Sequence, residues 1–202
     1  MISNIKYTDD EINNIILLNV LKMLNRRNIL VEVDKYYEKL KNTLLNNIFK
    51  IVLSDKIEYN IYILEGKISN ISQNTNIYNY LIKNIDIKKI VIGNFDSIKP
   101  IKQIVNNFKN VEFFFKEEMM EDIPSKIYVP EHILLSKQEK IELLSYYNKE
   151  DLPKMLIHDV MSRYYKASVG DIFKIIRPSM SNCYTIYYRR VISNGNNNCL
   201  NL

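Results

Sequence analysis

The sequence has no tryptophan, and of its 202 residues only four are glycine, two are histidine and two are cysteine. A loop that cradles phosphates needs several glycines close together, and this scarcity argues against one. Two cysteines cannot form a disulfide framework, so we expect an intracellular, reducing compartment. His132, His158, Cys183 and Cys199 do not follow a zinc-binding spacing. We therefore expect no metal site and no other cofactor.

The chain also lacks a long hydrophobic run and a strong charge of either sign. The apolar run at residues 15–18 ends at Asn19 and is far too short to span a bilayer, and no secretory signal is visible. Residues 1–122 contain 17 Lys and Arg against 16 Asp and Glu, and residues 123–202 contain 11 against 7. Neither half has the dense basic surface of an autonomous nucleic-acid-binding protein. We expect no membrane contact, and any DNA contact should be shared with partner proteins.

The first 122 residues alternate helical and strand patterns. Thr8 and Glu11 have the spacing of a capping box, which begins a helix whose apolar positions cover more than half of its circumference. A second helix is expected from Asp34. The pattern then predicts strands at 48–53, 57–64, 88–93 and 111–115, and helices at 75–85 and 100–108. This alternation favours an α/β domain with a mixed sheet, layered like a restriction endonuclease.

A charged segment at 117–122, followed by Pro124, is predicted to join this domain to a second one. The second half predicts an extended segment at 127–135, a helix from the capping box of Ser136 and Glu139, and a shorter helix capped by Asp159. Strands are expected at 171–177 and 184–192. Together they predict a small α+β domain at 123–193, and residues 194–202 are expected to form a disordered polar tail.

The strand at 184–192 alternates in a way that predicts two different faces. We expect one face to lie inside and the other to be available to a partner protein. The inner face would consist of Tyr184, Ile186 and Tyr188, and the outer face of Thr185, Tyr187 and Arg189.

Four pieces of the second half carry a resemblance to a known family, in its order and at nearly its spacing. They are residues 129–132, residues 136–147 with Leu152 and Pro153, residues 159–164, and Gly170 with residues 174–179. This segment resembles the assembly domain of the shared fifth subunit of eukaryotic RNA polymerases, which has an archaeal counterpart. Residues 88–93, 102–103 and 111–115 extend the resemblance to the first half, which archaeal members lack. The excess of Asn and Ile suggests an AT-rich genome, as in some large DNA viruses or protists.

The sequence departs from the family at two places. Val160 follows Asp159 where the family often has proline, and residues 97–100 replace a loop that usually reads Thr-Pro-Ser-Ala. The second change alters the loop that, in the family, approaches downstream DNA.

The resemblance implies a non-catalytic core subunit of a multisubunit DNA-dependent RNA polymerase. Residues 1–122 would form a jaw beside downstream double-stranded DNA, with contacts that do not depend on base sequence. Residues 123–193 would be an assembly domain that docks on the largest subunit, with other core subunits nearby. No small-molecule substrate is implied. The expected location is the nucleus, or a viral factory or virion for a viral protein.

Two groups of residues are the candidate binding sites. Lys99, Lys102 and Lys109 fall on the polar side of the predicted helix at 100–108, where cations can meet DNA phosphates or simply face solvent. The second domain is rich in arginine and tyrosine, which suit a protein interface; the alternative is tyrosine in the core and arginine in solvent. The candidate partner-binding residues are His132, Arg163, Tyr164, Arg177, Tyr187 and Arg189. His132 is also expected to form a structural hydrogen bond in its extended segment.

Two alternatives to a polymerase subunit remain. Asp55, Glu65 and Lys67 have the order and rough spacing of a PD-(D/E)xK nuclease site, in which two carboxylates hold Mg²⁺ and a lysine orients water. However, Ser54 stands where that motif has proline, and residues 54–56 and 65–66 have the pattern of turns. The other alternative is an unattached adaptor protein that has the same fold.

Overall fold

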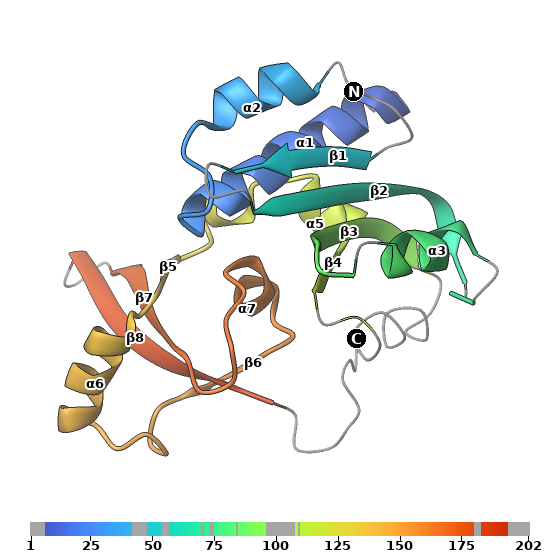
Figure 1. The fold of residues 1–202 in the computed structure, drawn as a ribbon. Coiled ribbons are helices and arrows are strands. Elements are labelled where there is room, and N and C mark those ends of the chain that lie inside the picture. Colours follow the sequence, from blue (N-terminus) through green and yellow to red (C-terminus); the bar gives the residue numbers. More distant parts are fainter. Residues whose placement is uncertain are drawn as a thin grey trace. The chain divides into compact units, whose positions relative to one another are not determined.

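The computed structural model describes residues 7–41, 48–53, 57–69, 71–72, 75–83, 85–95, 108, 110–179 and 183–193. The chain divides into two compact units, Met1–Asp122 and Ile123–Leu202, each with its own four-stranded sheet (Figure 1). Among the described residues, no helix is long and apolar enough to cross a membrane.

The first unit is an α/β fold around a mixed sheet with the strand order β1-β2-β3-β4. Strands β1 and β2 are antiparallel, whereas β2, β3 and β4 run parallel to one another. Its elements are α1 (Asp9–Arg26), α2 (Val33–Leu40), β1 (Ile48–Val52), β2 (Glu58–Ile68), α3 (Asn76–Ile82), β3 (Lys88–Phe95), β4 (Val111–Phe115) and α5 (Lys116–Met119). The predicted alternation of helices and strands is therefore confirmed for the described elements.

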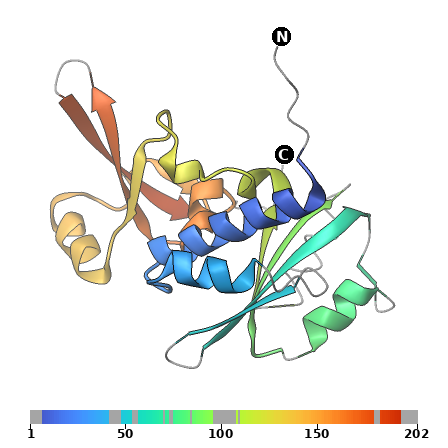
Figure 2. The same cartoon turned by 90° about the horizontal axis from the view of Figure 1, so that it is seen from above.

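Helices α1 and α3 cover opposite faces of this sheet (Figure 2). Arg27, which caps the end of α1, forms an ion pair with Glu112 of β4 at 2.7 Å. On the other face, Lys89 of β3 donates from Nζ to the carbonyl oxygen of Leu81 in α3 at 3.3 Å. Glu112 pairs in register with Ile90, and neighbouring residues of a strand point to opposite faces, so Glu112 and Lys89 lie on different sides.

Strand β2 is longer than the sequence pattern predicts. Glu65 and Gly66 were expected to form a turn, yet both lie inside β2, and that prediction is wrong. The register with β3 shifts between Ile63 and Lys67, and Gly66 has a φ of +66°. Because glycine adopts positive φ without steric cost, the chain passes through an irregularity there and continues as a strand. The predicted helix at 100–108 falls outside the described residues except for Phe108.

The second unit is an α+β fold whose sheet has the order β5-β7-β8-β6. Strand β7 runs antiparallel to both of its neighbours, β5 and β8, and β6 runs parallel to β8. The elements are β5 (Glu131–Leu134), α6 (Lys137–Tyr146), β6 (Lys154–Leu156), α7 (Val160–Tyr164), β7 (Ile172–Ser179) and β8 (Cys183–Ile192), preceded by a 3-10 turn at Ile123–Ser125. The extended segment expected from residue 127 begins only at β5.

Each face of this second sheet has its own hydrophobic core. On one face, Phe173, Ile175 and Val191 pack with Met155 and with Met161 of α7. On the other face, Leu143 of α6 packs with Leu152 and Ile172, and Tyr188 lies against this cluster. The helices that form these cores begin at the predicted caps: Ser136 accepts from the amide of Glu139, and Asp159 accepts from the amide of Met161.

The prediction that Tyr184, Ile186 and Tyr188 form an inner face is wrong for two of the three residues. Tyr188 is half-buried beside α6, but Tyr184 is 59% exposed and Ile186 is 40% exposed. The β7–β8 hairpin continues past α6, so the helix covers only the part of the sheet near Ile172 and Tyr188 (Figure 1). The side chains of β8 do alternate between two faces. Among the described residues, however, no helix or loop covers the half of the hairpin that contains Tyr184 and Ile186.

Candidate partner-binding surface

The register of the second sheet brings four of the predicted partner-binding residues to one face. His132 of β5 pairs with Ile175 of β7, which in turn pairs with Tyr187 of β8. Residues paired directly across strands, and residues two apart along a strand, share a face. Arg177 follows Ile175 by two positions, and Arg189 follows Tyr187 by two. We call His132, Arg177, Tyr187 and Arg189 the basic face.

Three members of the basic face are open to a partner. Tyr187 is 48% exposed, and Arg177 and Arg189 are also exposed. In the described part of the chain neither arginine forms an ion pair, whereas the neighbouring Arg190 binds Glu150 at 2.7 and 3.1 Å. Arginine and tyrosine offer wide contact area and directional hydrogen bonds, so an exposed set of this kind is suited to a protein interface.

His132 is held in place by its own segment. Its Nδ1 donates to the carbonyl oxygen of Pro130 at 2.7 Å, and its ring packs edge-on against Phe173 at 6.0 Å between centroids. The side chain is half-buried. The expected structural hydrogen bond is therefore present. His132 is the half-buried member of the basic face, next to the core residue Phe173.

The two predicted residues of α7, Arg163 and Tyr164, are not part of the basic face. Tyr164 is 2% exposed and packs against Tyr165 at 5.3 Å between ring centroids, so its ring lies in the interior and offers no surface to a partner. Arg163 is half-buried and donates from Nε to the carbonyl oxygen of His158 at 3.1 Å. Burial, and to a lesser extent the positive charge of Arg163, lowers the pKa of His158.

The opposite side of the hairpin is apolar. Tyr184 and Ile186 are exposed there, and the register places them opposite Pro178 and Ile176 of β7. We call these four residues the apolar face. The hairpin thus presents two chemically different surfaces on a single two-stranded ribbon.

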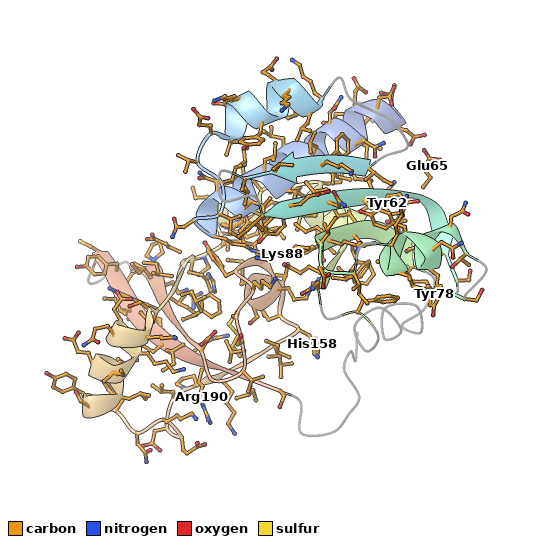
Figure 3. All side chains as sticks on the ribbon, viewed as in Figure 1. Tyr62, Glu65, Tyr78, Lys88, His158 and Arg190 are labelled. Atoms are coloured by element: carbon orange, nitrogen blue, oxygen red, sulfur yellow. The ribbon has the colours of Figure 1, made fainter. Side chains whose placement is uncertain are left out.

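Among its described residues, the first unit offers no cluster of side chains suited to catalysis. Asp55 lies outside the described residues, and Glu65 and Lys67 are both exposed near the end of β2 (Figure 3 labels Glu65). A pocket of about 500 Å³ lies beside them, lined by Tyr62, Glu65, Lys67, Ser69, Thr75 and Ile77 among others. No group of three or more His, Cys, Asp or Glu side chains within the described ranges could hold a metal ion. Lys99, Lys102, Lys109 and Cys199 also lie outside those ranges.

Tyr62, which lines this pocket, and Tyr80, which packs against Tyr62, are poor candidates for proton transfer. The rings of Tyr62 and Tyr80 meet edge to face, with centroids 4.7 Å apart. Burial raises the pKa of both phenols, so both stay neutral near pH 7. Their environment therefore opposes the phenolate that a general base would require.

Comparison with known proteins identifies the family through the second unit. A family model described as RNA polymerase Rpb5, C-terminal domain, matches residues 121–191. The DNA-directed RNA polymerase subunit Rpo5 of Methanothrix thermoacetophila is 44% identical over 66 residues, which are 32% of this chain and 85% of that protein. The chain belongs to the RNA polymerase Rpb5 family. The four pieces that carried the resemblance all lie in or beside the matched segment.

Other Rpb5 relatives come from eukaryotes and from a virus. The rpabc1 subunit of RNA polymerases I, II and III of Dictyostelium discoideum is 41% identical over 81 residues, which are 39% of this chain and 41% of that protein. The match thus spans about two fifths of that relative's length. The RNA polymerase subunit 5 of Acanthamoeba polyphaga mimivirus is 29% identical over 149 residues, 73% of this chain and 72% of that protein. These names are those of polymerase subunits and give the nuclease alternative no support.

Proposed function

We propose that the chain is a non-catalytic core subunit of a multisubunit DNA-dependent RNA polymerase. The observation that carries the proposal is that the Rpb5 family match coincides with the second compact unit, from its first residues to the end of β8. A docking module needs shape and polar anchors and no nucleophile, which agrees with the chemistry of the basic face. The polymerase's Mg²⁺ and its catalytic residues would lie on other chains.

Within that complex, the second unit would dock on the largest subunit through the basic face. The support is chemical: Arg177 and Arg189 are exposed cations beside Tyr187, on a sheet whose other side is apolar. A partner surface with carboxylates or backbone carbonyls would satisfy both guanidinium groups. Other core subunits would then lie nearby.

The first unit would form the jaw beside downstream DNA. Its mixed sheet, with α1 and α3 on opposite faces, is consistent with layering of the restriction-endonuclease type. Contact with DNA would be electrostatic and independent of sequence, and Lys99, Lys102 and Lys109 are the residues we assign to it. The location would be the nucleus, or a viral factory or virion, because relatives come from both eukaryotes and a virus.

An affinity-tagged full-length chain tests the docking. We expect the tagged protein to co-purify the largest polymerase subunit at stoichiometric yield. The double variant Arg177→Glu/Arg189→Glu should reduce that yield by about tenfold or more, because it opposes charge with like charge at the interface. The matched control is Lys137→Glu/Lys149→Glu, which makes the same change of charge at exposed residues of the second unit away from the basic face.

The outcomes separate the alternatives. If both double variants co-purify the largest subunit at the wild-type yield, the basic face is not the docking surface. The assignment as a polymerase subunit would still stand. Tagged protein that purifies without polymerase would indicate the unattached adaptor and would overturn the subunit assignment itself.

A further inference from the structure

Among the described residues, strand β8 has a free edge along most of its length. Its outer neighbour β6 pairs only with Arg190, Val191 and Ile192. The amide of Arg190 donates to the carbonyl oxygen of Pro153, and the amide of Ile157 donates to the carbonyl oxygen of Ile192. The backbone groups of Arg190 and Ile192 therefore point to the outer side.

Backbone direction alternates along a strand, so the N–H and C=O groups of Tyr184, Ile186 and Tyr188 point to the same outer side. The amide of Val191, by contrast, donates toward Asp171, on the side of β7. In the part of the chain that the structure describes, no strand pairs with β8 on this side before Arg190. Three successive outward-facing positions thus form a ready template for another strand.

The other edge of the same hairpin is protected, and this contrast is informative. Beyond Glu131, β5 no longer covers β7, and the next outward-facing position of β7 is Pro178. Proline has no N–H to donate, so it blocks strand addition at that edge. The stretch 184–188 reads Tyr-Thr-Ile-Tyr-Tyr, without proline, glycine or charge. A β-prone, uncharged edge of this kind is an aggregation hazard unless another strand covers it.

We propose that an extended segment of a polymerase partner chain pairs with the free edge of β8 at residues 184–188, and that its side chains alternate between apolar and acidic. This inference rests on the proposed function, since the partner would be a chain of the same polymerase. Side chains paired across strands share a face. Every second residue of the segment would therefore extend the apolar face beside Tyr184 and Ile186, and the residues between them would lie beside Tyr187 and Arg189.

Charge favours a partner chain over a second copy of this protein. The second unit contains 11 Lys and Arg against 7 Asp and Glu; Arg189 lies on the edge strand β8, and Arg177 lies one strand further in, paired with Thr185. Pairing two β8 edges would bring two positively charged units together, which like-charge repulsion opposes. An acidic segment instead gains from the same two arginines. This is the strand-addition mode of recognition, in which main-chain hydrogen bonds give affinity and alternate side chains give specificity.

Hydrogen exchange tests the edge without any mutation. The amides of Tyr184, Ile186 and Tyr188 should exchange rapidly in the free full-length chain and slowly in the polymerase complex captured through its affinity tag. The amide of Tyr187 faces β7 and should be protected in both, which gives an internal control. Residue-resolved exchange by mass spectrometry with electron-transfer fragmentation gives the readout. Unchanged exchange at all three outward amides in a captured complex would overturn the proposal.

A pair of variants separates the edge from the apolar face. Ile186→Pro removes one outward N–H and leaves an apolar ring, and it should lower co-purification of the largest subunit by about tenfold. Ile186→Ala keeps the N–H and removes most of the side chain, so its effect should be clearly smaller. Circular dichroism and thermal unfolding check the fold of each variant, and Tyr184→Pro, nearer the hairpin's end, replaces Ile186→Pro if the latter unfolds.

The remaining outcomes are also decisive. Equal reductions for Ile186→Pro and Ile186→Ala would show that the face binds and the edge does not. A dimer of the free chain in light scattering, abolished by Ile186→Pro, would show that a second copy covers the edge and would overturn the proposal of a partner chain. Failure of the wild-type chain to capture polymerase would overturn this inference together with the proposed function, whereas capture without edge protection overturns the inference alone.

Discussion

Lys89 shows that a charged residue can take a fully buried position in a strand. The sequence at 88–93 predicts a short buried strand, and Lys89 follows that prediction although it is charged: it is 2% exposed, and its Nζ donates to the carbonyl oxygen of Leu81. Burial lowers the pKa of Lys89, and Asp86 only partly opposes this effect. The residue joins β3 to the end of α3, which no pattern in the sequence could have shown.

The buried ammonium predicts a dependence of stability on pH. Because the folded-state pKa lies below the unfolded value of 10.5, the unfolded chain binds more protons in the interval between them. The free energy of unfolding of the wild type should therefore rise relative to that of Lys89→Met as the pH approaches 10.5 from below. Urea unfolding of both proteins near pH 7 and near pH 10 measures the difference.

Lys83→Met provides the control, because it removes a lysine from the exposed end of α3 without touching the interior. A wild-type stability that falls relative to Lys89→Met over the same interval would contradict the burial of the charge.

For other single residues, too, the sequence alone does not show whether the side chain is buried or exposed. Tyr164 and Tyr187 look equally suited to an interface, yet Tyr164 is buried and Tyr187 is 48% exposed. Helix α7 has only five residues, too few for a helical period to reveal its inner face. Arg189 and Arg190 could be separated only by the alternation of β8, which turns one toward solvent and the other toward Glu150 (Figure 3 labels Arg190).

At the scale of elements, helix starts were the most predictable features. The capping boxes of Thr8 with Glu11 and of Ser136 with Glu139 are both formed, because they depend only on residues three positions apart. How far α6 covers the sheet depends instead on packing between distant segments. That is why the exposure of Tyr184 and Ile186, and with it the free edge of β8, was not predicted from an alternating strand pattern alone.

The cap of α6 predicts a measurable contribution to stability. Ser136→Ala removes the acceptor for the amide of Glu139 and should lower the free energy of unfolding by about 1 kcal/mol. Ser145→Ala is the control, since Ser145 lies within the same exposed helix and its Oγ bonds only to the carbonyl oxygen of Glu142. Alanine is the better helix former there, so this control should be neutral or slightly stabilising.

The same cap has a pH signature. Hydrogen bonds from the side chain and backbone of Ser136 lower the pKa of Glu139, so the carboxylate's contribution is present above the unfolded value of 4.5 and is lost as the pH falls through the lower folded value. The effect of Ser136→Ala, measured by urea unfolding, should shrink below that range. An unchanged effect at about pH 3, well below the ordinary pKa of a glutamate, would show that the hydrogen bond between the Ser136 side chain and the Glu139 carboxylate contributes little.

At the scale of the whole molecule, the two halves differ in how well the sequence alone explains them. The second unit carries motifs at nearly family spacing, and those motifs coincide with capped helices and paired strands, so fold and family could be inferred together. The first unit was predicted from alternation and from a resemblance at a few short segments, which give the element types but not the order of strands in the sheet. Its candidate DNA-facing residues, Lys99, Lys102 and Lys109, have only a sequence pattern and a resemblance to support them.

Salt dependence provides a direct test of the jaw. In a polymerase that contains this chain, Lys99→Ala/Lys102→Ala/Lys109→Ala should weaken binding to double-stranded DNA about equally for different sequences. The slope of log K against log salt should become shallower by about 0.9 for each phosphate that the protein no longer neutralises, because each neutralised phosphate releases condensed counterions. The control, Lys39→Ala/Lys50→Ala/Lys83→Ala, removes the same charge from exposed positions of the first unit. If both triple variants change the slope alike, the effect comes from net charge, and the three lysines at 99–109 have no specific place beside the DNA.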